Sequence, residues 1–375
     1  MKIFSRFLSF FARFGRYRST HKPQPSHCQS QPTTITMKKI VLMLFVTATA
    51  TLAQGPLSPP GTPAPTMKTL DQIEARTAIP GSPAVPIAGP HFTISQPGSY
   101  YLVGNVEVAS GNGINITARN VTLDLNGFAL ISKTVSPAAG NAINIAGNLR
   151  SIEIKNGRIT GGTVRTPTGP KPWNATFEGQ GWLIGINDQE LSNASGVLLS
   201  HLTVEQCGSN GIDLDGQGAL FHISVNNNGN FGIYAPKSNI TNATATNNGS
   251  SGIVAQFGNV TNASAINNNS NGINTSNGSV TNATASSNGG SGIFAENGIV
   301  TNASAANNGD RGIAAIAGSV TNSRASGNFK SGISVGIGVA AHCVASGNST
   351  DPATVDRQID VSAGGQRDAC VPASE

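Results

Sequence analysis

Apolar and polar positions repeat every 20 residues through the C-terminal half of the chain. Each repeat begins with Gly-Ile, and an asparagine recurs at the same spacing. The Gly-Ile dipeptides begin at Gly232, Gly252, Gly272, Gly292, Gly312 and Gly332. A fixed period this short is typical of stacked coils, in which each residue lies above its equivalent in the next repeat.

Alternation within one repeat predicts short strands. Gly-Ile is followed by Val-Thr-Asn, then by Ala-Ser/Thr-Ala, and the repeat closes at Asn-Asn-Gly. Period-two patterning indicates strands, and Asn and Gly indicate the turns between them. Earlier coils are longer, and they begin at Gly113, Ala142, Gly185 and Gly211. We therefore expect about ten coils of three strands each, a rod roughly 48 Å long at ~4.8 Å per coil.

The fold class that fits this period is all-β, a right-handed parallel β-helix. A helical repeat would need longer apolar stripes and fewer glycines and asparagines, and 20 is not a multiple of the six-residue unit of left-handed coils. We place the β-helix at 92–348. A cap at 67–91 that begins with a short helix precedes it, and a C-terminal cap or tail at 349–375 follows it.

The opening of the β-helix carries a family resemblance. Gln-Pro-Gly-Ser-Tyr-Tyr-Leu at 96–102 and Val-Thr-Leu-Asp-Leu-Asn-Gly at 121–127 resemble secreted bacterial members, of uncharacterised function, of the pectate-lyase-like superfamily. The resemblance covers 92–348 and implies the fold. It implies no reaction, because the Asn-Thr-Asp, Asp-Asp and Gly-His-Gly segments of polygalacturonase-like enzymes do not occur.

The positive net charge comes from the first 53 residues of the chain. The whole chain carries +5, but removing residues 1–53 takes away 8 basic residues and no acid, which leaves 15 basic and 18 acidic residues and a net charge of −3. This balance argues against nucleic-acid binding. Residues 1–36 are then an over-long gene reading or a basic extension.

The segment that follows has the anatomy of a signal peptide at 37–53. Lys38 and Lys39 precede an apolar run that is too short to span a membrane, and small residues end at Ala53. A Pro-rich linker follows at 54–66. We expect a mature chain without a membrane span that is exported to the periplasm, the cell surface or the medium.

Two polar columns recur at corners of the coils. The first is expected to form a ladder of stacked amides, with an asparagine-lined ligand site as the less favoured interpretation. It comprises Asn228, Asn248, Asn268, Asn288, Asn308, Asn328 and Asn348. The second contains His201 and His222 on neighbouring coils, which with Glu205 are weak candidates for a metal site. The favoured alternative is that histidine simply replaces asparagine at a polar corner.

The largest interruption of the repeat, 161–184, is the first candidate for function, because long loops on a rigid scaffold often bind ligands. Its aromatic and charged residues suit sugar rings and their hydroxyl or carboxylate groups. With Tyr234, the carbohydrate-binding candidates are Trp173, Phe177, Trp182, Arg165 and Lys171. The equally weighted alternative is that the loop folds back over the wide early coils.

Asp213 and Asp215 are the catalytic candidates, because they alternate with Ile212 and Leu214 and so share one face of a strand about 7 Å apart. Such a pair acts as acid and base or holds calcium, although a solvated strand face carries acids too. No other cofactor is indicated. We expect a Cys343–Cys370 disulfide that ties the tail to the last coil, with Cys207 free.

These features favour a secreted binding or structural module that contacts extracellular polysaccharide. The alternative is a polysaccharide lyase or glycoside hydrolase with its site on the face of the early coils. A column of threonines at 241, 261, 281, 301 and 321 suggests ice or crystal-surface binding as a third and least favoured function.

Overall fold

The computed structural model describes residues 75–135, 137–146, 148–188, 195–348, 358–362, 365–368 and 370–372. They all belong to one compact unit that spans 68–375. These residues form strands and turns only, and none of them lies in a helix that could cross a membrane. The basic extension, the signal peptide, the linker and the capping helix expected before Arg76 lie outside the described residues.

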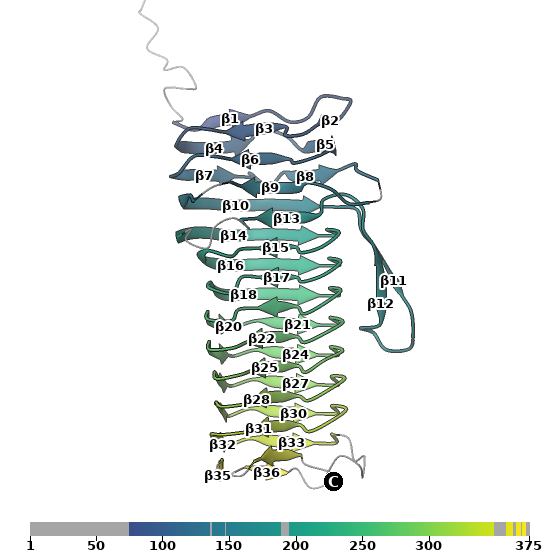
Figure 1. Cartoon of the computed structure of the whole chain (residues 1–375), viewed down its shortest axis with the longest axis vertical. Coiled ribbons are helices and arrows are strands. Elements are labelled where there is room, and N and C mark those ends of the chain that lie inside the picture. The colour runs from purple at the N-terminus through teal and green to yellow at the C-terminus, as the bar shows by residue number, and fades with distance from the viewer. Residues whose placement is uncertain are drawn as a thin grey trace, which may run out of the picture. The chain divides into compact units, whose positions relative to one another are not determined.

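The chain is a right-handed parallel β-helix of about 12 turns, as the repeat predicts. The Gly-Ile segments form one parallel sheet (Figure 1). Its strands are β3 (Phe92–Ile94), β6 (Ile114–Ile116), β9 (Asn141–Ile145), β13 (Ile184–Asn187), β15 (Ile212–Asp213), β17 (Ile233–Tyr234), β19 (Ile253–Val254), β22 (Ile273–Thr275), β25 (Ile293–Ala295), β28 (Ile313–Ala315), β31 (Ile333–Val335) and β34 (Ile359–Val361). Strands β3 and β34 extend the ten expected coils by one at each end.

The other two strands of each coil belong to a second parallel sheet, which bends at a corner. In the early coils it comprises β1 (Thr77–Ile79), β2 (Ile87–Ala88), β4 (Gly98–Leu102), β5 (Val106–Ser110), β7 (Val121–Asp124), β8 (Ala129–Ser132), β10 (Arg150–Thr160), β14 (Ser195–Glu205), β16 (Gln217–Asn226) and β18 (Asn239–Thr246). In the later coils it comprises β20 (Val260–Thr261), β21 (Ser264–Ile266), β23 (Val280–Thr281), β24 (Thr284–Ser286), β26 (Ile299–Thr301), β27 (Ser304–Ala306), β29 (Ser319–Thr321), β30 (Arg324–Ser326), β32 (Val339–Ala341), β33 (Val344–Ser346), β35 (Gln366–Asp368) and β36 (Val371–Pro372).

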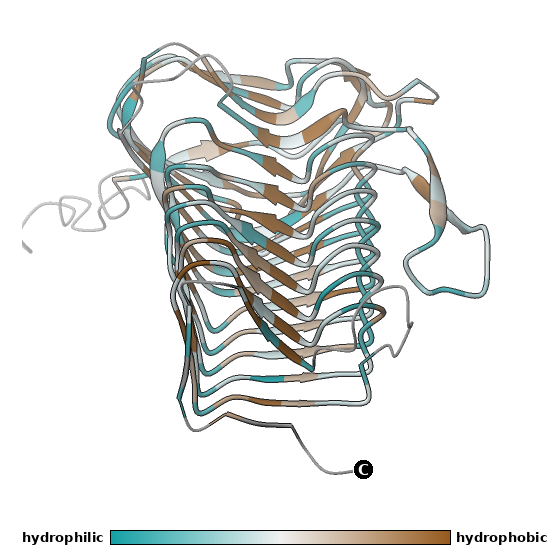
Figure 2. Cartoon of the chain, turned by 60° about the horizontal axis from the view of Figure 1, so that its bottom comes forward, coloured by the Kyte–Doolittle hydropathy of each residue, from teal (hydrophilic) through white to brown (hydrophobic). Residues whose placement is uncertain are grey.

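The core is a stack of layers in which equivalent side chains lie above one another. Ile253 pairs with Ile273 and Ile273 with Ile293, so that each inward side chain rests on its equivalent. Figure 2 shows the hydrophobic residues concentrated along the stacked strands and hydrophilic residues along the corners. The two inward positions that hold Leu202 and Val204 in β14 hold small residues from β18 onward, beginning with Ala243 and Ala245, so the core narrows toward the C-terminus.

The first corner column forms the predicted ladder of buried asparagines. Asn288 accepts hydrogen bonds from the side chain and backbone N–H of Asn268, at 2.9 and 3.0 Å. Its own Nδ2 donates to Asn308 Oδ1 and to the Ala265 carbonyl, both at 3.0 Å. The ladder ends when Asn348 donates to Gln358 Oε1 at 2.7 Å. Each amide thus closes its own turn and joins the next coil.

Left-handed backbone conformations occur next to the ladder asparagines rather than at them. The residue before each one has positive φ, as at Asn267 (φ 56°) and Asn307 (φ 55°). The second corner column is left-handed as well, for example at His222 (φ 54°) and Asn242 (φ 56°). The ladder positions therefore require asparagine for its amide, whereas the flanking positions use its tolerance of positive φ.

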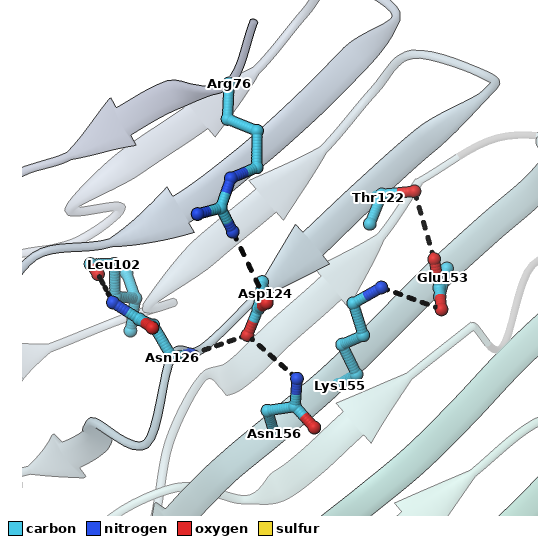
Figure 3. Close-up of polar contacts among 8 residues, drawn as sticks. All are labelled: Arg76, Leu102, Thr122, Asp124, Asn126, Glu153, Lys155 and Asn156. Atoms are coloured by element: carbon cyan, nitrogen blue, oxygen red, sulfur yellow. Dashed lines mark hydrogen bonds and ion pairs between the residues drawn. The ribbon is translucent and has the colours of Figure 1, made fainter. Parts of the chain in front are cut away.

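A polar cluster joins the first coils (Figure 3). Asp124 on β7 accepts from the Asn126 backbone N–H at 2.8 Å and from Asn156 Nδ2 at 3.2 Å, and it pairs with Arg76 at 3.5 Å. The Arg76 guanidinium also lies 4.6 Å from the centre of the Tyr101 ring. These contacts tie the residue before β1 to two later coils, which is a structural role.

The last coil places two thiols side by side. Val344 pairs with Val371, and the preceding Cys343 donates its backbone N–H to Cys370 Sγ at 3.4 Å. Both are free thiols in this structure. Cys207 is also free, and its complete burial raises the pKa of its thiol. The arrangement agrees with the proposed bridge, which stays a prediction.

The ladder generates a stability prediction. Replacing Asn288 with leucine removes its amide from four hydrogen bonds and leaves neighbouring buried groups unpaired, so unfolding should become easier by roughly 3 kcal/mol, or about 6–12 °C in Tm. Asn297→Leu is the matched control, since this exposed amide donates one bond to Asn277. Thermal unfolding of both variants checks the prediction, and an unchanged Tm for Asn288→Leu would contradict the ladder's role.

The thiol pair generates a second prediction. We expect protein prepared under oxidising conditions to yield a peptide cross-linked through Cys343 and Cys370, while Cys207 reacts with an alkylating agent only after unfolding. Non-reducing mass spectrometry measures both outcomes. Alkylation of Cys343 and Cys370 without prior reduction would show that no bridge forms.

Candidate functional site

The interruption of the repeat at 161–184 forms a β-hairpin outside the coils. Its strands, β11 (Val164–Pro167) and β12 (Ala175–Glu178), pair antiparallel. Figure 1 shows this hairpin descending beside the later coils. The hairpin therefore covers later coils, whereas Trp182, near the end of the interruption, packs into the early coils beside Gly113, as the alternative interpretation expects.

Glycines that follow the ladder asparagines provide the surface on which the hairpin rests. A Cβ atom at Gly249 would lie 3.1 Å from the Phe177 ring, and one at Gly289 would lie 2.8 Å from the Trp173 ring. Between these contacts, Asn269 Nδ2 donates to the Ala175 carbonyl at 2.9 Å. None of these glycines has positive φ, so their small size at this surface serves close approach rather than an unusual backbone conformation.

A groove of 700 Å³ lies between the hairpin tip and the later coils. Its hairpin side contains Lys171 and Trp173, with Lys171 Nζ 5.4 Å from the centre of the Trp173 ring. Its coil side contains Asn307 and Phe329, and the Phe329 side chain is 63% exposed. The remaining lining residues are Pro170, Pro172, Ser287, Gly289, Asn308, Gly309, Gly327, Asn328 and Gly347. Aromatic faces with a few amides and one cation suit a sugar-like ligand.

Three other carbohydrate candidates serve the fold. Trp182 is completely buried in the core, which excludes it from ligand contact and corrects the prediction. The Arg165 guanidinium donates to the Pro172 carbonyl and so holds the hairpin loop, and burial lowers its pKa. Phe177 is half-buried against Gly249.

Asp213, Asp215 and Tyr234 line a second pocket. This pocket holds 430 Å³ on the Gly-Ile sheet and is also lined by Asn210 and Phe231. Asn210 Nδ2 donates to Asp213 Oδ2 at 2.7 Å, and the rings of Phe231 and Tyr234 stack at 5.4 Å. No hairpin residue is part of its lining, so this pocket and the groove beside the hairpin are separate sites.

Asp188 is an ionisable residue of this region that the sequence pattern did not single out. Its side chain is buried, and Oδ1 accepts the Asp215 backbone N–H at 2.7 Å. Burial raises the pKa of this carboxyl to about 7, and the charges of Asp215 and Asp213 act in the same direction. The signal was present in the alternation, since Asp188 follows the outward Asn187 and occupies the inward row of Leu214.

The histidine pair continues the corner column. The rings of His201 and His222 stack at 4.7 Å, and His222 Nε2 lies 3.1 Å from Asn242 Nδ2. Glu205 accepts instead from Thr160 Oγ1 at 3.2 Å and pairs with Arg158 at 3.5 Å. Within the part of the chain that the structure describes, no three His, Cys, Asp or Glu side chains gather to hold a metal ion.

The threonine column on β18, β20, β23, β26 and β29 is partly buried. Two of its hydroxyls, those of Thr301 and Thr321, lie 3.1 Å apart and bond to each other. Hydroxyls that satisfy one another are less available to order water, so this column gives ice binding little support.

Comparisons with known proteins found structural likeness only. No family model and no curated protein matches the chain. The A-module of mannuronan C-5 epimerase AlgE4 from Azotobacter vinelandii is similar in structure, with TM-score 0.49 and 13% identity over 73% of this chain and 91% of that one. The Dettilon tailspike protein (TM-score 0.46, 14% identity, 80% of this chain, 61% of that one) is also similar. So is a double mutant of the periplasmic alginate epimerase AlgG (TM-score 0.44, 10% identity, 74% and 76%). At these values, function has to be argued from this chain's own residues.

Asp188 generates a pH prediction. Because its pKa in the folded state is raised from 3.8 to about 7, folding retains a proton that the unfolded chain releases. Stability should therefore fall as pH rises from about 4 to 7, by at most ~1.4 kcal/mol per pH unit from this group, and level off above pH 7. Asp188→Asn keeps an oxygen for the Asp215 N–H and should remove this slope. Denaturant unfolding across this pH range tests it, and parallel curves for the two proteins would contradict it.

Proposed function

We propose that this chain is an exported β-helix protein that binds an extracellular polysaccharide in the groove beneath the hairpin. The observation that carries the proposal is the pair of aromatic side chains, Trp173 and Phe329, in one groove. Trp173 lies over Gly289 and Gly309, and Phe329 occupies the equivalent corner position one coil further along. The two rings thus follow one another along the axis of the coils, at about one strand spacing between corners.

Such a row of aromatic faces suits a chain of sugar rings. The apolar face of a sugar stacks on an aromatic ring, and its hydroxyls need donors and acceptors at the edges. Ser287, Asn307 and Lys171 supply those groups in the groove. Among the described residues that line the groove, Lys171 is the one charged side chain, so an acidic sugar would meet a favourable charge there.

The groove is also held in shape before a ligand arrives. Phe177 packs on Gly249, and Asn269 donates a hydrogen bond to the Ala175 carbonyl, so β12 anchors the hairpin to the coils. The opposite wall consists of coils that the asparagine ladder joins to one another. Preformed walls reduce the ordering entropy that binding would otherwise cost.

A polysaccharide lyase or glycoside hydrolase is the second candidate, and it rests on a different observation. Asp213 and Asp215 line one pocket, as two carboxylates acting on a glycosidic bond would. Incubation with acidic and neutral polysaccharides, followed for unsaturated products and reducing ends, separates the two candidates. Cleavage that disappears in Asp213→Ala would favour the enzyme, and retention of the glycan without cleavage would favour binding.

The groove generates a binding prediction. In affinity electrophoresis through gels that contain the same polysaccharides, the protein should be retarded by at least one of them. Trp173→Ala and Phe329→Ala should each weaken that binding by about tenfold or more, because each removes a stacking face.

Phe257→Ala is the matched control. Phe257 is 62% exposed, against 63% for Phe329, but it lies on another corner outside the groove. Its loss should leave retardation unchanged. Equal retardation of all three variants and the wild type would place the glycan elsewhere and refute the groove.

A further inference from the structure

We infer that the pocket at β15 and β17 is a separate site that binds an amino sugar through its ammonium group. The lining is Asn210, Asp213, Asp215, Phe231 and Tyr234. These five residues provide two carboxylates and two aromatic rings and include no cationic side chain. The groove under the hairpin shares no residue with this pocket, so the inference does not depend on the proposed function.

The two carboxylates are positioned by the strand and its neighbours. Asp213 pairs with Tyr234 in the register, and Asp215 follows two residues later on the same side. Asn210 holds the Asp213 carboxylate through its 2.7 Å hydrogen bond, and the Asp215 backbone N–H is held by Asp188. Asp213 is 4% exposed and forms the floor, whereas Asp215 is only half-buried. A compact cation would therefore meet a fixed and a more open carboxylate.

A buried acceptor beside this pair gives an independent indication of a donor-rich ligand. Asn187 lies next to Asp213 in the register and is 8% exposed. Its Nδ2 donates to Asn144 Oδ1 at 3.1 Å on the preceding coil, and its Oδ1 receives no hydrogen bond from any residue that the structure describes. Asn187 Oδ1 is thus a buried acceptor without a donor, on the strand that neighbours Asp213. An ammonium group has three donors and no acceptor, which is the complement of this set.

The aromatic rings select among cations. Phe231 and Tyr234 stack at 5.4 Å with an interplanar angle of 28°, and burial together with both aspartates raises the pKa of the Tyr234 phenol. A π face attracts an ammonium group and also covers the apolar face of a sugar ring. The volume of 430 Å³ lies within the range of small-molecule sites. Calcium instead needs six to eight oxygen ligands, which this lining does not provide.

The test uses isothermal titration calorimetry of the full chain in slightly acidic, low-salt buffer, with the trimer of glucosamine and the trimer of N-acetylglucosamine as probes. The glucosamine trimer should bind and the acetylated trimer should not, because acetylation removes the positive charge. Asp213→Asn and Tyr234→Ala should each weaken binding by at least about tenfold. Glu296→Gln, which alters an exposed carboxylate at a distant corner, should have no effect.

Several outcomes would overturn the assignment. Equal binding of the acetylated trimer would show that the ammonium group is not what the pocket recognises. Saturable calcium binding that excludes the sugar would identify a metal site instead. Tighter binding of trilysine would identify a peptide site. Loss of binding in Trp173→Ala would show that the glucosamine trimer binds in the groove beside the hairpin and not in this pocket. If Asp213→Asn does not fold, Asp215→Asn replaces it, and unchanged affinity in a folded variant would refute the proposal.

Discussion

Stacking in register is the constraint on which this structure depends. Backbone hydrogen bonds join each coil to its two neighbours, and the buried asparagine row adds a side-chain link that also closes each turn. A coil that departs from the common outline disturbs both neighbours. This explains why the coils after β18 repeat nearly the same inward residues and carry few charges, and why the long insertion places its hairpin outside the stack.

The candidate groove exists because an irregular segment lies against a regular one. The corner column offers repeated glycines, and the hairpin places aromatic rings on them at Gly249, Gly289 and Gly309. Neither part forms a groove by itself. The acidic pocket has a different origin, because it arises where outward positions of neighbouring coils change from Asn187 to Asp213 and then to Tyr234. One site is thus made by an insertion and the other by variation within the repeat.

Stacking also decides what could be predicted from the sequence. Because equivalent positions face the same surroundings, the same residue types recur, and the coils, strand pattern and ladder residues follow from the period. The hairpin's resting place could not be predicted, because the interruption has no period and its docking depends on close approach to glycines far along the chain. Aromatic content likewise did not reveal that Trp182 faces the core, whereas the inward place of Asp188 was available in the alternation.

The hairpin has one consequence for how such a chain can change in length. Duplicating a whole 20-residue unit between Asn268 and Asn288 would reproduce the interfaces on either side of it, since each coil meets only similar neighbours. The hairpin, however, has a fixed reach that ends at the tip beside Trp173. A longer stack would slide Phe329 away from that tip. The fixed length of the hairpin therefore limits how many coils can lie between its anchoring contacts and its tip.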